Sequence, residues 1–442
     1  MSKKTYLCGV VLCMLPGVVA AQPAPDMRKI LNRLDLLEQE NHKLLDEIQA
    51  LRRELQSGQT ASAPPAAPVD DRLDIAEKRI DELAQTKVEA SHRLPISVTG
   101  MLLFNAFENG ANGGGAQYPT VAALTPAAVA AGASLQQTIL GLKFDGPDLP
   151  GGGKASGNLY MDFFGGEYGS TVRLRTATLD LAWKNTTLSF GQDKPIFSPR
   201  DPDSLAQVGV SPLTGAGNLW DWQPQLRLEQ RFPLGDNAGF RAQAGVYETS
   251  EYSAFVPVAF ENSLESYRPG YEGRFEFWHG NDTGRFEIAP GFHVSETHVA
   301  GTSVPSRIAS LDGLWRPLNY LQFTGAFFHG ENVANTGALP DSFTFLTSGV
   351  VIPVHATGGW AQAAIFATPR LSFHFYAGEQ RNRQSDLLAS DIGSNFVYAG
   401  NVMYRLGSNV LASFEASQTR TLYLDSGTRI NNHYDLALAY LF

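Results

Sequence analysis

Residues 434–442 read Tyr-Asp-Leu-Ala-Leu-Ala-Tyr-Leu-Phe, and this stretch decides the fold. Leucine or an aromatic residue stands at every second position, while Asp435, Ala437 and Ala439 between them are acidic or small. A period of two with one wholly apolar face predicts a β-strand between an apolar phase and water. A chain that stops on such a strand is typical of an outer-membrane β-barrel, with Tyr440 and Phe442 as its closing signature.

The other end of the chain predicts export. Lys3 and Lys4 precede an apolar run over residues 6–19, and small residues follow it. This pattern predicts a signal peptide at residues 1–21. Both cysteines lie inside it, and Leu12 before Cys13 makes a poor lipoprotein cleavage box. The mature chain is therefore expected to have no disulfide and no metal site. It has no further apolar run of about 18 residues, so no membrane-spanning helix is expected.

The charge balance is acidic. The chain has 34 Lys and Arg against 44 Asp and Glu, and loss of Lys3 and Lys4 leaves 32 basic residues, a formal −12. This argues against a nucleic-acid partner. It says little about what a pore would select, because selectivity is set locally.

Residues 22–56 predict a periplasmic coiled coil. Apolar residues step by four and three from Ile30, with charged residues between them, and Asn41 on the seam would fix the register. A single amphipathic helix lying on the barrel is the alternative. The residues expected to hold an oligomer together are Leu34, Leu37, Asn41, Leu44, Ile48, Leu51 and Leu55.

Residues 57–69 are rich in Ala, Pro and Ser and predict an extended linker. A second apolar seam from Val69 to Leu83 predicts a further helical segment over residues 70–93. Pro95 then ends any helix, and the barrel domain is expected to cover residues 94–442.

From residue 96 onward the chain is rich in Gly and aromatics and alternates in segments of about ten residues. Short and long connections follow one another, as in bacterial outer-membrane barrels with short periplasmic turns. We therefore predict an all-β transmembrane barrel of about sixteen antiparallel strands, wide enough for an aqueous channel. The expected strands are 95–107, 135–145, 155–164, 170–183, 186–192, 222–232, 238–249, 270–279, 283–295, 306–316, 318–329, 357–367, 369–380, 394–406, 409–419 and 431–442.

Aromatic residues near the short turns predict an interfacial girdle on this barrel: Trp183, Trp278, Trp315, Tyr404 and Phe442. A soluble β-sandwich is the competing architecture. It would have no reason to sort its loops by side, since both its apolar faces share one core.

The connection over residues 193–221 follows the fifth expected strand and contains three prolines among its first ten residues. In general porins this loop folds into the lumen and narrows it. An exposed extracellular loop is the alternative. Arginines lie on the polar faces of the flanking strands, and they must point into the lumen because a lipid-facing arginine costs about 2–4 kcal/mol.

These residues predict a pore eyelet that attracts anions, since guanidinium groups match carboxylates. The expected eyelet residues are Arg173, Arg175, Lys194, Arg200, Asp201, Asp203, Arg227, Glu229, Arg231 and Arg241. In the alternative, Arg227 and Arg231 pair with Glu229 and the loop acids Asp201 and Asp203 and are purely structural. The apolar face of the fourth strand changes phase after Arg175, which predicts a β-bulge near Thr176.

Catalytic chemistry is not expected. The histidines are scattered, no serine lies in a nucleophile motif, and no metal-ligand spacing stands out. We expect no enzyme activity, cofactor or metal. A barrel-borne lipid hydrolase is the enzymatic alternative.

The chain resembles the DcaP-like family of trimeric outer-membrane porins, with the phosphate-selective porins as a neighbour in architecture. The resemblance rests on the helical segment Arg28–Ala84, on Val172–Arg175, and on Leu188–Gln192 before the Pro-rich loop. It implies a homotrimer in the outer membrane, with its coil in the periplasm, that takes up small anionic solutes such as dicarboxylates. The acids Asp193, Asp201 and Asp203 beside the basic loop residues depart from a strongly anion-selective pattern.

We therefore expect a porin for passive diffusion of small hydrophilic, anionic solutes, in contact with outer-membrane lipid. In the alternative, the protein tethers the envelope: its coil binds peptidoglycan and its barrel is chiefly an anchor. A trimeric adhesin fits less well, because here one chain supplies a whole barrel.

Overall fold

The computed structural model describes residues 95–165, 170–248, 264–265, 269–281, 284–299, 301–346 and 350–442. The expected signal peptide, coiled coil, linker and second helical segment lie outside these residues, and so do all the residues expected to hold the oligomer, from Leu34 to Leu55. In the part that is described, no helix has the length and hydropathy to cross a membrane.

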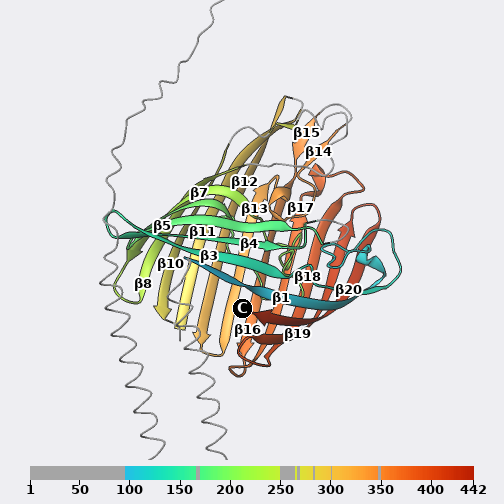
Figure 1. Cartoon of the computed structure of the whole chain (residues 1–442). Coiled ribbons are helices and arrows are strands. Elements are labelled where there is room, and N and C mark those ends of the chain that lie inside the picture. Colours follow the sequence, from blue (N-terminus) through green and yellow to red (C-terminus); the bar gives the residue numbers. More distant parts are fainter. Residues whose placement is uncertain are drawn as a thin grey trace, which may run out of the picture. The chain divides into compact units, whose positions relative to one another are not determined.

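Sixteen antiparallel strands form a closed barrel (Figure 1). Each strand pairs with the next along the chain, and the last pairs with the first. The predicted barrel and its strand number are confirmed. The strands are β1 (Ile96–Asn109), β3 (Ile139–Leu149), β4 (Gly153–Asp162), β5 (Arg173–Ala182), β6 (Thr186–Asp193), β7 (Gln223–Pro233), β8 (Ala238–Tyr247), β10 (Gly270–Asn281), β11 (Gly284–Val299), β12 (Thr302–Leu318), β13 (Leu321–Glu331), β16 (His355–Phe366), β17 (Leu371–Asn382), β18 (Ile392–Arg405), β19 (Val410–Tyr423) and β20 (Gly427–Leu441).

Shorter elements lie on the connections. β2 extends the pairing of β1, β9 pairs with the end of β11, and β14 and β15 form a separate hairpin. Their bounds, with those of the three 3-10 turns, are β2 (Ala130–Ser134), β9 (Leu264–Glu265), β14 (Phe343–Phe345), β15 (Val351–Pro353), η2 (Ala111–Gly113), η4 (Ala334–Thr336) and η5 (Gln384–Asp386).

β20 closes the barrel against β1. The register runs from Met101 opposite Leu441 to Asn109 opposite His433. The chain end continues this pairing, because the Gly100 N–H donates to the Phe442 carbonyl at 2.9 Å and the Phe442 N–H donates back at 3.2 Å. A side chain at Gly100 would meet the Phe442 ring, so the terminal aromatic ring covers a glycine.

The two faces of the barrel differ as the alternation predicts. Large apolar side chains on the outer face are exposed, such as Phe104, Leu226, Phe375 and Leu436. The intervening side chains are polar and point into the lumen, as Asn105 does beside Phe104. In a membrane this outer face would meet lipid, while the lumen holds polar side chains.

The predicted bulge on β5 is confirmed. Tyr160 of β4 is opposite Thr176 and Met161 is opposite Leu174, so Arg175 is the extra residue. The bulge changes the phase of β5, so that Leu174 before it and Leu179 after it are both exposed on the outer face, while Arg173 and Arg175 pair with Asp162 in the lumen.

The connections alternate in length with two exceptions. Short ones, such as 183–185 and 319–320, lie at one end of the barrel, and long ones, such as 110–138, 194–222 and 332–354, lie at the other. The predicted loops over 296–305 and 420–430 are wrong: only residues 300–301 separate β11 from β12, and 424–426 separate β19 from β20. In both places the strands continue to pair with each other. The prediction missed this because the sequence there is mixed and does not alternate between apolar and polar residues.

The aromatic girdle is only partly as expected. Trp315, Tyr404 and Phe442 are exposed on the outer face. Trp278 instead shares the lumen face of β10 with Glu276, and its ring covers Gly239 of β8. The prediction used only its position at the end of a strand. Because side chains alternate along β10, Trp278 points inward like Glu276.

Removing Phe442 should impair barrel assembly. The deletion breaks the two backbone hydrogen bonds to Gly100, each worth about 0.5–1.5 kcal/mol, and uncovers that glycine. We expect less heat-modifiable barrel in membrane fractions on gels. Phe375→Ala, which shortens a similarly exposed outer ring far from the seam, is the matched control, and equal yields for both variants would contradict this role.

Candidate functional site

Residues 194–222 connect β6 to β7 and lie inside the barrel. Their backbone and side chains bond to lumen-facing side chains on strands all around the wall, which a loop outside the barrel could not reach. The predicted fold of this loop into the lumen is therefore confirmed. Its partners include Asn105 on β1, Arg175 on β5, Asp312 on β12, Gln362 on β16 and Asn401 on β18.

The loop is held in shape by its own acid. The Asp201 carboxylate accepts hydrogen bonds from the Ser211 hydroxyl at 2.7 Å and the Asn218 amide at 3.1 Å, and it forms an ion pair with Lys194. Asp201 thus joins the two halves of the loop, and its charge is matched by Lys194. Both residues were expected at the eyelet, and the structure brings them together.

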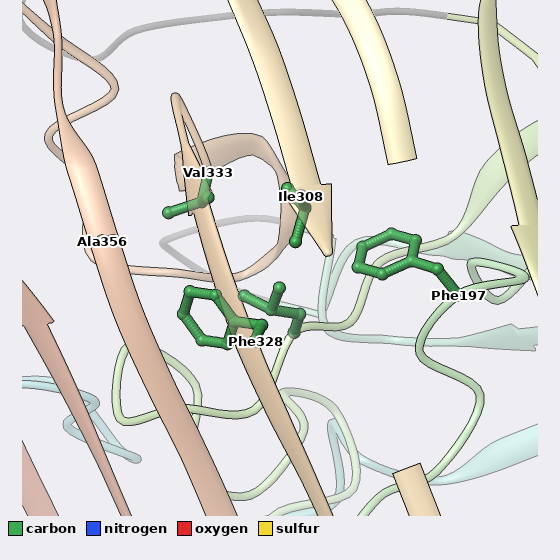
Figure 2. Close-up of a cluster of buried hydrophobic side chains, with 6 residues drawn as sticks. Phe197, Ile308, Phe328, Val333 and Ala356 are labelled. Carbon is green, nitrogen blue, oxygen red and sulfur yellow. The ribbon is translucent and has the colours of Figure 1, made fainter. Parts of the chain in front are cut away.

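An apolar seat fixes the first half of the loop against the wall. Phe197 is fully buried, and its cluster includes Ile308 of β12, Phe328 of β13, Val333 and Ala356 (Figure 2). The Ser310 hydroxyl donates to the Phe197 carbonyl at 2.8 Å. Burying one phenylalanine contributes about 1.5–3 kcal/mol, so the loop is bound to the wall by packing as well as by charge.

Arg200 anchors the loop to an acidic patch on the wall. Its guanidinium donates to Asp312 at 2.5 Å, pairs with Glu287 and approaches Glu276 at 3.4 Å. These three carboxylates are almost completely buried. The same carboxylates also form ion pairs with Arg274, Arg241 and Arg285, so four arginines share three carboxylates. A buried charge is tolerated only when it is paired in this way.

Asp203 anchors the next turn of the loop to β16 and β17. Its carboxylate accepts from the Gln362 amide at 2.6 Å and lies 3.4 Å from His374. Burial alone would raise the pKa of Asp203, but His374 and Gln362 outweigh it and the pKa lies below its usual value. The Asn401 amide donates to the Asp203 carbonyl at 2.9 Å. Asp203 therefore remains a charged anchor.

The neighbouring Ser204 binds a buried acid. Its hydroxyl donates to the Glu415 carboxylate at 2.7 Å, and Tyr376 and Asn401 donate to the same carboxylate. Glu415 is 1% exposed. Its three donors make this contact structural, since they satisfy a carboxylate that has no access to water.

Arg173 and Arg175 form one basic unit with an aromatic ring. Both guanidinium groups pair with the fully buried Asp162, at 2.7 and 2.8 Å. Their carbons lie 4.9 and 4.4 Å from the Trp222 ring centroid, which suits a cation–π contact. They also donate to loop carbonyls at 208 and 209. Two cations share one carboxylate, so the unit keeps positive charge.

Asp221 lies beside this unit. Burial raises its pKa to about 6, although the backbone N–H of Trp222 and the charge of Arg173 act in the opposite direction. The net charge next to Arg173 and Trp222 therefore changes near neutral pH.

The remaining eyelet arginines are paired as well. Arg227 pairs with Asp193 at 3.0 Å, and Arg231 pairs with Glu229 at 2.7 Å. Arg241 lies 2.7 Å from Glu276 and 3.8 Å from Glu229. The structural alternative is therefore partly correct. Glu229 pairs with Arg231 as that alternative predicts, but Arg227 pairs with Asp193 and not with Asp201 or Asp203. Arg231 remains 58% exposed in its side chain.

Several lumen residues were not expected from the sequence. Their inward direction follows from the period of two, but nothing along the chain shows that strands far apart in sequence bring their charges together. They are Asp162, Trp222, Glu272, Arg274, Glu276, Glu287 and Asp312. Within the described ranges, no group of histidine and acidic side chains could hold a metal ion.

Comparison with protein-family models finds no match, and comparison with curated proteins finds none either. Solved structures do match. The outer membrane channel DcaP of Acinetobacter baumannii has a TM-score of 0.65 and 15% identity, over 78% of this chain and 97% of that one. OmpT of Vibrio cholerae has a TM-score of 0.50 and 9% identity, over 78% and 97%. At these identities the likeness shows the fold, and the predicted resemblance to DcaP is confirmed at that level: this chain has the barrel fold of that channel.

Proposed function

We propose that this protein is an outer-membrane porin for the passive diffusion of small hydrophilic solutes. The observation that carries the proposal is a closed barrel with an apolar outer face, whose lumen is narrowed by a loop bound to its wall on several sides. An even number of antiparallel strands with short turns at one end suits an outer-membrane barrel. Sixteen strands can enclose an aqueous channel.

We further propose a modest preference for anions, dicarboxylates among them. Arg173 and Arg175 share one carboxylate, and the exposed Arg231 shares the Glu229 carboxylate with Arg241. Field lines from such uncompensated charge raise the local concentration of anions in a pore. The preference is modest because most other lumen arginines already have carboxylate partners.

A homotrimer, with the coiled coil in the periplasm and close to peptidoglycan, belongs to the same proposal. It rests on the heptad seam at Leu34–Leu55. Outer-membrane lipid would cover the apolar face, and Tyr440 and Phe442 would lie against it.

Planar-bilayer recording tests the function directly. We expect single-channel conductance in steps of three and, in a salt gradient, a reversal potential that favours anions. Folded barrels that conduct nothing would show a closed lumen, and the envelope tether would then be the better explanation. In that case deletion of residues 28–90 should weaken the envelope, as measured by detergent sensitivity.

Arg200→Ala should open the pore and shift it toward cations. The change removes one of the loop's anchors on the wall and leaves Glu276, Glu287 and Asp312 with one cation fewer. Breaking a buried ion pair costs about 3–5 kcal/mol, so we expect larger, noisier single-channel currents and a lower anion-to-cation permeability ratio. Arg381→Ala removes an exposed arginine from the outer face and serves as the control. Identical currents in the two variants would mean that Arg200 does not hold the constriction.

The anion preference should fall as the pH rises through about 6. Because burial raises the pKa of Asp221 to about 6, this group is neutral at pH 5 and adds a negative charge beside Arg173 at pH 7.5. Reversal potentials at the two pH values measure the change. The Asp221→Asn variant should show, at both pH values, the anion preference that the wild type shows at pH 5. A wild-type shift that persists in Asp221→Asn would assign the titration to another group.

A further inference from the structure

A cavity lies between the loop and the short-turn end of the barrel. It has a volume of about 550 Å³, and residues 202–205 of the loop border it on one side. The ends of β13, β16, β17 and β18 border it on the other. Its polar lining includes Gln322, Arg370, Ser372, His374 and Arg405.

Two arginines meet at the rim of this cavity. The Arg405 N–H donates to the Arg370 carbonyl at 2.8 Å, because these residues continue the pairing of β17 with β18. The Arg405 guanidinium donates to the Ser408 carbonyl at 2.7 Å. Arg370 is exposed. Two guanidinium groups thus approach one space from adjacent strands.

A third arginine lies against the same wall. The Arg316 guanidinium carbon is 5.5 Å from the ring centroid of Phe366, and Phe366 lines the cavity. Arg316 donates to the Asn319 carbonyl at 2.8 Å, while its Nε is buried without a hydrogen-bond partner. Arg316 thus adds a positive charge next to the cavity without lining it.

These arginines differ from those at the eyelet in one respect. Arg173, Arg200 and Arg227 have carboxylate partners within 3.0 Å. No carboxylate of the described residues lies within ion-pair distance of Arg316, Arg370 or Arg405. The one acid that lines the cavity, Asp203, is already bound by Gln362 and faces His374. Among the described residues, the charge of these arginines is therefore not matched by a carboxylate.

We propose that this cavity is a second anion site, which takes a compact polycarboxylate on the short-turn side of the constriction. Guanidinium groups bind carboxylates through paired hydrogen bonds, and Ser372, Gln322 and His374 supply further polar contacts around the same space. Its role in transit rests on the proposed porin function: an anion that has passed the loop meets unmatched charge before it leaves. The binding itself does not depend on ion flow.

Calorimetric titration of citrate into the detergent-solubilised full chain, at low salt so that charges are weakly screened, tests the site. We expect saturable binding by the wild type and none of triethyl citrate, which has the same skeleton without charge. The double variant Arg370→Gln/Arg405→Gln should weaken citrate binding by at least about tenfold, because it removes two charged donors.

The matched control removes two arginines elsewhere. Arg381→Gln/Arg420→Gln makes the same charge change on the outer face and should bind citrate as the wild type does. Heat-modifiable migration on gels confirms that each variant is folded. Equal binding by the two double variants, or no citrate binding by the wild type, would overturn the site. Loss of binding only in Arg370→Gln/Arg405→Gln, in a protein that conducts no ions, would uphold the site and reject the porin.

Discussion

The pairing of β1 with β20 is the constraint on which the rest of the structure depends. Backbone N–H and C=O groups in a bilayer find no partner in the lipid, so a sheet can cross it only as a closed barrel. Here the last residue takes part, because Phe442 exchanges hydrogen bonds with Gly100. Closure also creates an interior, and only an interior can hold the loop that narrows it.

The lumen is governed by a second rule: buried charge must be paired. Arg200 reaches three carboxylates on the wall, and Asp162 holds both Arg173 and Arg175. These pairs fix the loop, but they also remove much of the positive charge from the constriction. A count of lumen arginines therefore overstates the attraction for anions. Under the proposal above, an anion would instead be held near the short turns, where Arg370 and Arg405 have no carboxylate partner among the described residues.

Much of the fold could be predicted because alternation is a local property. The strand at 434–442, the bulge at Arg175 and the inward loop after the fifth strand all follow from side-chain phase and connection length. The extended pairing of β11 with β12 was missed, because the sequence over residues 296–305 is mixed and lacks a continuous apolar alternation. Trp278 was misassigned for a related reason: its place at a strand end was considered without its phase.

The sequence by itself determined which residues face inward, since a period of two leaves each side chain only two directions. It also determined that arginines would be among them. Only the tertiary structure decided which carboxylate each arginine meets. Asp193 and not Asp201 pairs with Arg227, and Arg200 of the loop pairs with Asp312 of β12. Such partners come from strands far apart in the chain, and the barrel brings them together only when it closes.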